Sequence, residues 1–311
     1  MLKPPKLRAG DTIGVISPAS KPPDEQKFWR GIEYLKNRGF SVVVGKNALK
    51  KRGYLAGRDK ERAEDLNEMF RRPDIQAIIC ARGGYGGPRL LELIDYDAIK
   101  QNPKIFVGYS DITVLQNAIM AQTGLITYSG PMVAVEMGAG IHPYTEEHFW
   151  PLLIESLSRF SLENPIDQPW NVIQEGVAEG PIVGGCLSVI TPLIGSRYFP
   201  DYSGGILVVE DIDEEAYRID RALFHIRAAG ILNQLNAIVF GDFIDCEAKD
   251  RTKPSLTVEE VLHDAIQGLS IPVIKDFAYG HGRTKLTLPF GARARLDTST
   301  NRFEVIESVA T

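Results

Sequence analysis

The stretch that decides the fold is IQAIICARGGYGG, residues 75–87. Its first half is an apolar run rich in isoleucine, which is typical of a strand buried in a parallel sheet. Its second half is a loop in which four of the five residues from Gly83 to Gly87 are glycine. Glycines let the backbone adopt positive φ angles and approach a ligand closely. A buried strand that ends in such a loop is typical of the ligand-binding edge of an open α/β sheet.

The segments around this stretch alternate between strand-like and helix-like patterns. Apolar, β-branched runs bounded by Gly or Pro predict strands, and charged segments with apolar residues three or four apart predict helices. We therefore expect strands at 12–17, 40–44, 75–80 and 105–107, and helices at 24–38, 59–71, 88–99 and 112–122. Repeated β-α units of this length predict a parallel sheet with helices on both faces, as in flavodoxin-like or Rossmann-like domains.

The pattern changes after about residue 130. A helix is expected near 144–157, and the prolines and polar residues after it indicate a linker. Further along we expect strands at 206–209, 237–240 and 273–275, helices at 215–229 and 258–267, and a hairpin of 293–297 with 303–306. The chain is therefore expected to have an N-terminal domain (1–150), a linker (151–175) and a mixed α/β C-terminal domain (176–311).

The composition indicates a globular protein and excludes several other classes. Of 311 residues, 44% are hydrophobic and 24% are charged, which excludes a disordered chain. The net charge of −5 argues against a general nucleic-acid binder, because phosphate backbones attract clustered Lys and Arg. No run approaches the roughly 20 apolar residues of a membrane span. The N-terminus lacks the apolar stretch of a secretory signal, and the three cysteines are widely spaced, so we expect a cytoplasmic protein.

A second loop, Gly108-Tyr109-Ser110-Asp111, lies between the expected strand 105–107 and the expected helix 112–122. A serine on a sharp strand-to-helix turn projects its hydroxyl into the cleft, and the next backbone N–H is free to stabilise an oxyanion. The match to the nucleophile-elbow pattern Gly-x-Ser-x-Gly is partial, because Ile112 replaces the second glycine. Ser110 or Asp111 could equally be a helix cap.

An activated serine needs a base, usually a histidine, oriented by a carboxylate. Of the five histidines, His281 lies in a loop between two glycines, whereas the others fall in the linker region or in amphipathic helices. Glu210 and Asp211 follow the expected strand 206–209, and either could be the carboxylate or a helix-capping residue.

Other kinds of site receive less support from the sequence. Cys80 is a rival nucleophile, but it ends a buried strand with no evident base beside it, so a core role is favoured. No His-Glu-x-x-His metal motif is present, and the glycine loop lacks the spacing of a dinucleotide-binding fingerprint.

Several motifs together resemble those of the LD-carboxypeptidase (muramoyltetrapeptide carboxypeptidase) family of serine peptidases, which also contains the microcin C immunity peptidases. They occur in the family's order from near residue 7 to near residue 290, and each alone is a weak signal. The matching stretches are Leu7–Ile13 with Ser17–Ala19, Gly53–Gly57, Ala81–Gly86, Gly108–Asp111, Gly184–Gly185, Glu210–Asp211 with Tyr217–Arg221, and Gly280–His281.

The resemblance implies a role for individual residues. Ser110 would be the nucleophile, His281 the general base and Glu210 the carboxylate that orients it. The backbone N–H groups of Gly84 and Asp111 would form the oxyanion hole. The implied fold is a flavodoxin-like N-terminal domain that carries the serine and a C-terminal domain with barrel-like β structure that carries the other two. Family members are typically cytoplasmic homodimers that need no metal or other cofactor.

The substrate implied by the resemblance is a murein tetrapeptide from cell-wall recycling, which loses its terminal D-alanine across an L–D peptide bond. A carboxypeptidase must also bind the free carboxylate of its substrate, and Arg82 beside the glycine loop is a candidate on charge and position. One departure from the family is visible, because Cys186 stands where Asn is common. A thiol cannot supply the hydrogen bonds of that amide.

Two other functions remain open. The first is an immunity peptidase that cleaves peptidyl- or aminoacyl-nucleotide antibiotics, which calls for an aromatic clamp on a nucleobase; Trp170 and Tyr198 are available for this role. The second is a non-catalytic protein that binds a small ligand, against which the intact set of Ser, His and Glu argues. In each case the expected partner is a small molecule rather than a nucleic acid or a membrane.

Overall fold

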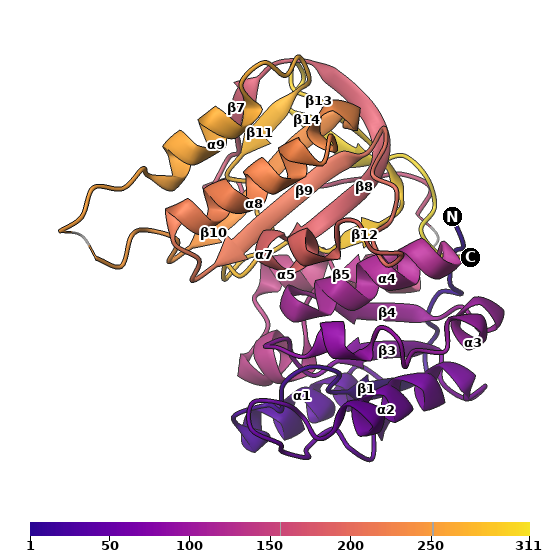
Figure 1. Ribbon diagram of the computed structural model, residues 1–311. Helices are drawn as coiled ribbons and strands as arrows, with labels where there is room; N and C mark the ends of the chain where they lie inside the picture. Colours follow the sequence, from indigo (N-terminus) through magenta and orange to yellow (C-terminus); the bar gives the residue numbers. More distant parts are fainter. Residues whose placement is uncertain (156, 251) are drawn as a thin grey trace.

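The computed structural model describes residues 1–155, 157–250 and 252–311, and its strands form two sheets (Figure 1). The first sheet has the order β12-β5-β4-β3-β1-β2. Strands β1 to β5 pair in parallel, in the 2-1-3-4-5 order of flavodoxin-like domains, so the expected N-terminal fold is confirmed. The strands are β1 Thr12–Ile16, β2 Ser41–Val44, β3 Ala77–Cys80, β4 Ile105–Gly108, β5 Thr127–Ser129 and β12 Leu288–Phe290.

Helices cover both faces of this sheet, and successive strand residues pack against different helices. In β1, Val15 joins the apolar cluster of Phe28 in α1, whereas Ile16 joins the cluster of Leu66 in α2. Burial on both faces explains why these strands are almost continuously apolar. The helices are α1 Glu25–Asn37, α2 Asp59–Arg71, η1 Gly87–Leu90, α3 Tyr96–Gln101, η2 Ser110–Ile112, α4 Thr113–Thr123 and the π-helix η3 Val133–Met137.

The second sheet is mixed and curls into a half-barrel, in the order β6-β14-β13-β8-β9-β10-β11-β7. Its centre, β8 to β11, is parallel, and the expected hairpin of β13 and β14 is confirmed. The strands are β6 Phe160–Ser161, β7 Asn171–Gln174, β8 Val177–Cys186, β9 Ile206–Ile212, β10 Ala237–Ile244, β11 Val273–Lys275, β13 Arg293–Asp297 and β14 Arg302–Val305.

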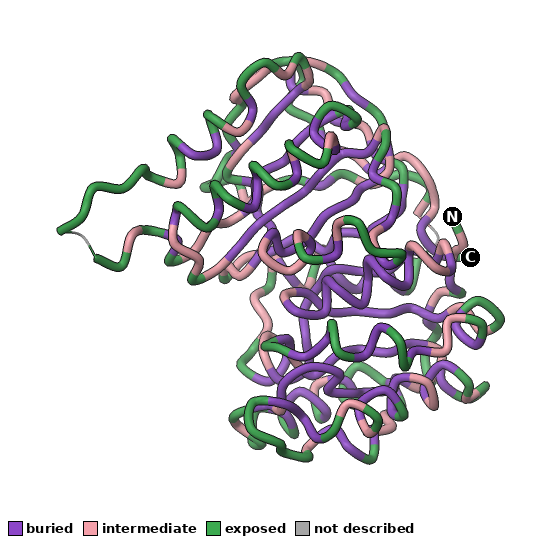
Figure 2. Tube along the Cα trace, viewed as in Figure 1, coloured by how far each residue is buried: buried purple, intermediate pink, exposed green. Residues whose placement is uncertain are grey.

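Two long helices, α8 and α9, cover one face of the second sheet, and their outer sides are exposed (Figure 2). The other helices after η3 are short. In chain order the helices are α5 Pro143–Glu147, α6 Trp150–Ile154, α7 Leu187–Ile190, η4 Thr191–Leu193, α8 Ala216–Ala228, η5 Leu232–Gln234 and α9 Val258–Ile266.

The structure differs from the sequence-based expectations in several segments. The expected helix 88–99 is two pieces, η1 and α3, because Asp95 accepts the N–H of Ala98 at 3.0 Å and so begins a new helix. The expected helix 144–157 is likewise divided into α5 and α6. The segment 151–175 contains β6 and β7, and its residue Ser156 lies outside the described residues. Strand β12 was not expected, and it pairs antiparallel with β5 of the first sheet.

Helix α4 joins the two sheets beside the loop that carries Ser110. The side-chain amide of Asn117 donates to the carbonyl of Gly184 at 3.0 Å, and its oxygen accepts the hydroxyl of Tyr202 at 2.6 Å. A Cβ on Gly185 would lie 2.3 Å from the side chain of Thr113, so only glycine lets β8 approach α4 this closely. This contact brings the carboxyl end of β8 next to the first turn of α4.

Candidate active site

Ser110 is the first residue of η2, at the sharp turn that follows β4, and has a φ of 63°. This left-handed conformation is uncommon for residues other than glycine, and it is typical of a serine lifted above the sheet on a nucleophile elbow. The glycine loop covers the serine. A Cβ on Gly83 would lie 2.7 Å from Ser110 Cβ and 2.9 Å from Ser110 Oγ, so the two backbones meet with no side chain between them.

The two amides considered for the oxyanion hole flank this turn. Asp111 lies in the first turn of η2, where backbone N–H groups have no acceptor within the helix. The Cβ position of Gly83 lies 3.3 Å from the Asp111 nitrogen, so the glycine loop passes close to that N–H. Gly84 has a φ of 105°, and a Cβ there would lie 2.4 Å from Ser20 Oγ. Ser20 in turn donates its N–H to the carbonyl of Gly83 at 3.2 Å, which fixes the loop.

Two buried charged side chains hydrogen-bond to the backbone of the glycine loop. Sequence analysis did not identify this role for either of them. The carboxylate of Asp111 accepts the N–H of Gly87 at 2.7 Å, and burial raises the pKa of this carboxyl to about 6. Arg62, which is 1% exposed, donates to the carbonyls of Gly86 and Pro18. In the sequence, Arg62 is one of many charged residues on an amphipathic helix, so nothing local distinguishes it from its solvent-facing neighbours.

His281 and Glu210 form a buried hydrogen-bonded pair. The distance from His281 Nδ1 to Glu210 Oε2 is 2.7 Å, and the two side chains are 13% and 1% exposed. The sequence suggested that Glu210 follows the strand, but in the structure it lies within β9. A Cβ on Gly280 would lie 2.8 Å from Glu210 Oε2, which explains the glycine before the histidine. A carboxylate in this position fixes the tautomer and orientation of an imidazole.

Tyr109 connects the serine turn with the histidine loop. Its ring meets that of His281 edge to face, with centroids 5.0 Å apart and planes at 66°. Because Tyr109 immediately precedes Ser110 and is 5% exposed, the two segments are in direct, buried contact. The turn of Ser110, the glycine loop and the Glu210–His281 pair therefore gather at one edge of the first sheet.

Asp242 on β10 supports the histidine loop, a role that sequence analysis did not identify. Its backbone N–H donates to the carbonyl of Tyr279 at 2.8 Å. Its carboxylate accepts the N–H of Gly282, and burial raises the pKa of Asp242 to about 6. The loop is thus held on both sides of His281. The expected strand 237–240 stopped short of this residue, so the sequence did not place it in the sheet.

The thiol of Cys186, at the position where the sequence resemblance predicts Asn, is directed at Asp211. Cys186 Sγ lies 3.5 Å from Asp211 Oδ1 and 3.6 Å from Ser188 Oγ. Asp211 also accepts the N–H and the hydroxyl of Ser188, at 2.7 and 3.0 Å. Burial raises the pKa of Asp211 to about 6. The carboxylate of Asp211 therefore accepts hydrogen bonds from neighbouring groups of the protein itself.

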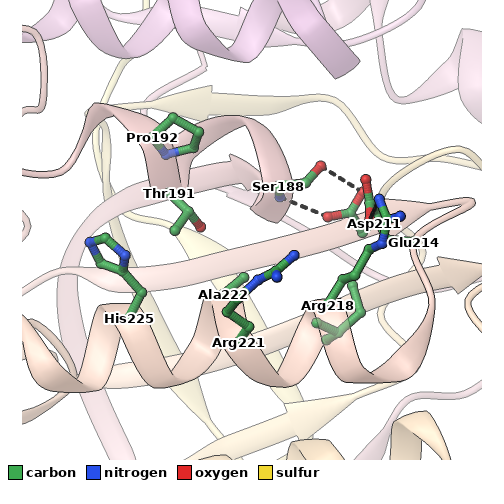
Figure 3. A pocket seen from close by; sticks show the side chains of 10 residues that line it. Ser188, Thr191, Pro192, Asp211, Glu214, Arg218, Arg221, Ala222 and His225 are labelled. Atoms are coloured by element: carbon green, nitrogen blue, oxygen red, sulfur yellow. Dashed lines mark hydrogen bonds and ion pairs between the residues drawn. The ribbon is translucent and has the colours of Figure 1, made fainter.

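Asp211 also lines a cavity of about 340 Å³ between α7, η4 and α8 (Figure 3). Arg218, Arg221 and His225 of α8 line its other side. Neighbouring residues of a strand point to opposite faces, so this cavity and the Glu210–His281 pair lie on opposite sides of β9. Arg82, in contrast, lies beside the glycine loop, with Nη2 3.5 Å from the Cβ position of Gly84.

The other nucleophile and ligand candidates have structural surroundings. Cys80 is fully buried, and this burial raises the pKa of its thiol well above the ordinary value, which disfavours a reactive thiolate. His142 Nδ1 accepts the N–H of Tyr144 at 3.3 Å and so begins α5. Among the described residues, no cluster of three or more His, Cys, Asp or Glu is placed to hold a metal ion. In the same part of the chain, no helix combines the length and the apolar content that crossing a membrane requires.

Comparisons with known proteins match both halves of the chain. Residues 13–130 match the LD-carboxypeptidase N-terminal domain, and residues 179–296 match the LD-carboxypeptidase C-terminal domain. A probable murein peptide carboxypeptidase of Bacillus subtilis is 41% identical over 307 residues, which cover 98% of this chain and 94% of that protein. The microcin C7 self-immunity protein MccF of Escherichia coli is 33% identical over 335 residues, with coverage of 97% and 94%.

Solved structures match along the whole length. MccF in complex with glutamyl sulfamoyl guanosine superposes with a TM-score of 0.91 at 30% identity, covering 100% of both chains. A muramoyltetrapeptide carboxypeptidase of Oxalobacter formigenes superposes with a TM-score of 0.83 at 32% identity, covering 96% of this chain and 100% of that one.

Proposed function

The chain belongs to the LD-carboxypeptidase family, and we propose that it is a serine peptidase that removes the terminal D-alanine of murein tetrapeptides by hydrolysing an L–D peptide bond. The observation that carries the proposal is the 2.7 Å hydrogen bond between buried Glu210 and His281, whose loop contacts the turn of Ser110. A buried carboxylate, an imidazole and a serine on a strained turn are the components of acyl transfer through a covalent intermediate.

The proposed reaction assigns one step to each group. Because Nδ1 of His281 is hydrogen-bonded to Glu210, Nε2 is the nitrogen that takes the proton of the Ser110 hydroxyl. Ser110 Oγ then attacks the carbonyl carbon, and the N–H groups of Gly84 and Asp111 donate to the oxyanion of the tetrahedral intermediate. The imidazolium protonates the amine of the leaving D-alanine. Water, activated by His281, finally releases the acyl group from Ser110.

The cellular setting follows from this substrate. The tetrapeptide would come from cell-wall recycling, so we propose a cytoplasmic enzyme, which acts as a homodimer like its family and needs no metal. Arg82 is the proposed partner of the substrate's free carboxylate. Its place beside the glycine loop supports this role, because the carboxylate of D-alanine lies only two bonds from the scissile nitrogen.

One observation favours the alternative, an immunity peptidase that acts on peptidyl- or aminoacyl-nucleotides. Tyr54 and Tyr85 are 65% and 51% exposed, and their rings meet edge to face 5.5 Å apart beside the glycine loop. Exposed aromatic pairs of this kind suit stacking on a flat ligand.

The two aromatics considered from the sequence are not suited to a nucleobase clamp. Trp170 is 9% exposed, packs against Phe277 and Phe303 and donates its indole N–H to Asn301 at 2.6 Å. Tyr198 is 8% exposed and packs against Tyr96. We therefore rank the murein substrate first.

The test is mass spectrometry of a murein tetrapeptide incubated with purified protein and with its Ser110→Ala variant. Loss of one D-alanine with the wild type only is the expected result, and the variant should be slower by a factor of about 10³ or more. Ser203→Ala, at an exposed serine of the second half, is the matched control and should behave as wild type. If the wild type leaves the tetrapeptide intact but cleaves an aminoacyl-nucleotide, the alternative holds. Binding without turnover, unchanged in Ser110→Ala, would indicate the non-catalytic protein.

A further inference from the structure

Behind His281 lies a buried cluster of three side chains, Tyr109, Glu136 and Lys285, to which the proposed reaction assigns no role. Lys285 Nζ lies 2.6 Å from Glu136 Oε1, and the hydroxyl of Tyr109 donates to the same oxygen at 2.8 Å. The side chains of Lys285 and Glu136 are 4% and 11% exposed, so water screens this ion pair little. Burial removes the hydration of both charges, which costs free energy. The attraction between the charges offsets this cost only if their geometry is well held.

Glu136 is anchored to the part of the site that carries the serine. It lies on the π-helix η3, and its second carboxylate oxygen accepts the N–H of Met132 at 2.9 Å. Two residues earlier, Ala134 donates its N–H to the carbonyl of Ala81 at 2.8 Å, directly before the glycine loop. Turns of π-helix are rare in proteins, and many of those that occur lie at functional sites.

Lys285 is anchored to the loop that carries the histidine. It follows His281 by four residues, and the N–H of Leu286 closes this loop on the carbonyl of Ala278 at 2.7 Å. The backbone N–H of Lys285 also donates to Thr145 Oγ1 at 3.0 Å. The ion pair therefore connects two segments that are about 150 residues apart. One carries His281, and the other is hydrogen-bonded to Tyr109, the residue before Ser110.

The ring of Tyr109 contacts both Lys285 and His281. Lys285 Nζ lies 4.0 Å from the centroid of this ring, within the range of a cation–π interaction. The same ring packs edge to face on the imidazole, with 5.0 Å between the centroids. A change in the ion pair is thus transmitted to His281 through one aromatic ring and through the short loop.

We propose that Lys285 and Glu136 are positioning residues, whose ion pair holds the His281 loop against the Tyr109–Ser110 turn and sets the imidazole within reach of the serine hydroxyl. The inference rests on the proposed function, in which His281 is the general base for Ser110. The pair also balances the charge beside the imidazole: Lys285 alone would disfavour an imidazolium, and Glu136 alone would favour it.

Other charged and titratable groups also face this histidine, and the test must leave them unchanged. Glu210 on β9 bonds Nδ1, Asp242 on β10 lies against Gly282 of the loop, and Tyr109 covers the ring. The positive charge of Arg82, in the glycine loop, interacts electrostatically with Tyr109. Because the variants below keep all four groups, a difference between variants reports on the ion pair.

The experiment compares Glu136→Gln, Lys285→Met and the double variant in hydrolysis of the murein tetrapeptide, once the wild type is found active. Each single variant should lower kcat by roughly 10- to 100-fold, as expected for a displacement of about 1 Å, with KM within about three-fold of wild type. The acid limb of the kcat/KM–pH profile should move to lower pH in Glu136→Gln and to higher pH in Lys285→Met. Lys285→Arg, which keeps the charge, should retain the wild-type limb.

Controls separate positioning from general destabilisation. Lys275→Met breaks an exposed pair of the same 2.6 Å length, to Glu259, and should leave kcat unchanged. The double variant leaves no unpaired buried charge, so it decides the question if a single variant does not fold. It should lower kcat by about five-fold or more, but by less than the product of the single effects, with an acid limb near that of wild type.

Several results would overturn the proposal. They are a wild-type kcat in the folded single variants or in the double variant, and limbs that move in the same direction or not at all. An inactive wild type would instead contradict the proposed function, and it would do so before any variant is compared.

Discussion

Gly83→Ala tests whether the glycine loop and Ser110 meet at the reacting centre. A Cβ on Gly83 would lie 2.7 Å from Ser110 Cβ and 2.9 Å from Ser110 Oγ. Carbon atoms pack at about 3.5–4.0 Å, so the loop and the serine would have to separate by about 1 Å. The φ of Gly83 is not in the left-handed region, so the backbone itself accepts alanine and the clash alone causes the displacement.

The expected result is a large loss of activity with a modest loss of stability. A shift of about 1 Å between reacting groups costs roughly 100-fold in kcat/KM, whereas overpacking of one methyl group costs about 1–3 kcal/mol in the free energy of unfolding. The assay measures kcat/KM on the tetrapeptide together with thermal unfolding.

The matched control is Gly14→Ala in β1. Its Cβ would lie 2.8 Å from Met69 Sδ, a similar clash that is not with Ser110. Because the end of the Met69 side chain can move aside, this control should lose no more stability than Gly83→Ala and keep its kcat/KM within about three-fold. Wild-type turnover by folded Gly83→Ala would refute the assignment of Ser110 and of the loop that covers it.

Three further predictions concern titration, thiols and metals. Burial raises the pKa of Asp211 from 3.8 to about 6, so its contribution to stability is full below pH 4 and falls by about 3 kcal/mol as the pH rises through 6. Urea unfolding of Asp211→Asn between pH 4 and pH 7 should lack that part of the pH dependence, and an unchanged dependence contradicts the burial argument. Because Cys80, Cys186 and Cys246 are all buried, a thiol reagent should label the native protein slowly and the denatured protein fully; fast native labelling would contradict this. Treatment with EDTA should leave turnover unchanged, since the proposed mechanism uses no metal, and a loss restored by one added metal would contradict that mechanism.

Local sequence patterns correctly predicted the helices and strands whose ends are determined by their own residues. Helix α2 begins and ends at Asp59 and Arg71, as expected from its charged and apolar periodicity. The hairpin of β13 and β14 follows from two short runs that alternate polar and apolar residues around a polar turn. Ser110 and His281 could be selected because glycines beside them indicate turns at strand ends. For these elements, local propensity and the final fold agree.

The elements that were missed depend on partners far away in the chain. Strand β8 contains Gly180, Gly184 and Gly185, which lower its strand propensity. It forms because a glycine Cα fits where a Cβ at Gly184 would lie 2.1 Å from the carbonyl of Val208 in β9. Sequence alone cannot show that contact.

The same limit applies to the charged residues around the site. Arg62, Glu136 and Lys285 look like ordinary surface charges in the sequence, yet all three side chains are largely buried. Arg62 donates to carbonyls of Pro18 and Gly86, and Lys285 pairs with Glu136, so most of the partners lie far away in the chain, where no local pattern can show them. The reacting groups were thus easier to identify than the residues that hold them.

The pairing of β12 with β5 has a consequence for biosynthesis. The edge of β5, at Thr127–Ser129, has no partner until Leu288–Phe290 has been translated. At the usual rate of synthesis that interval is roughly ten to thirty seconds. During it the nascent chain carries a finished serine turn and an open strand edge, which is a site for chaperone binding or for aggregation. Glu210 is made about midway through this interval, and His281 only a few residues before Leu288. The complete set of reacting groups and the closed strand edge are therefore gained almost together.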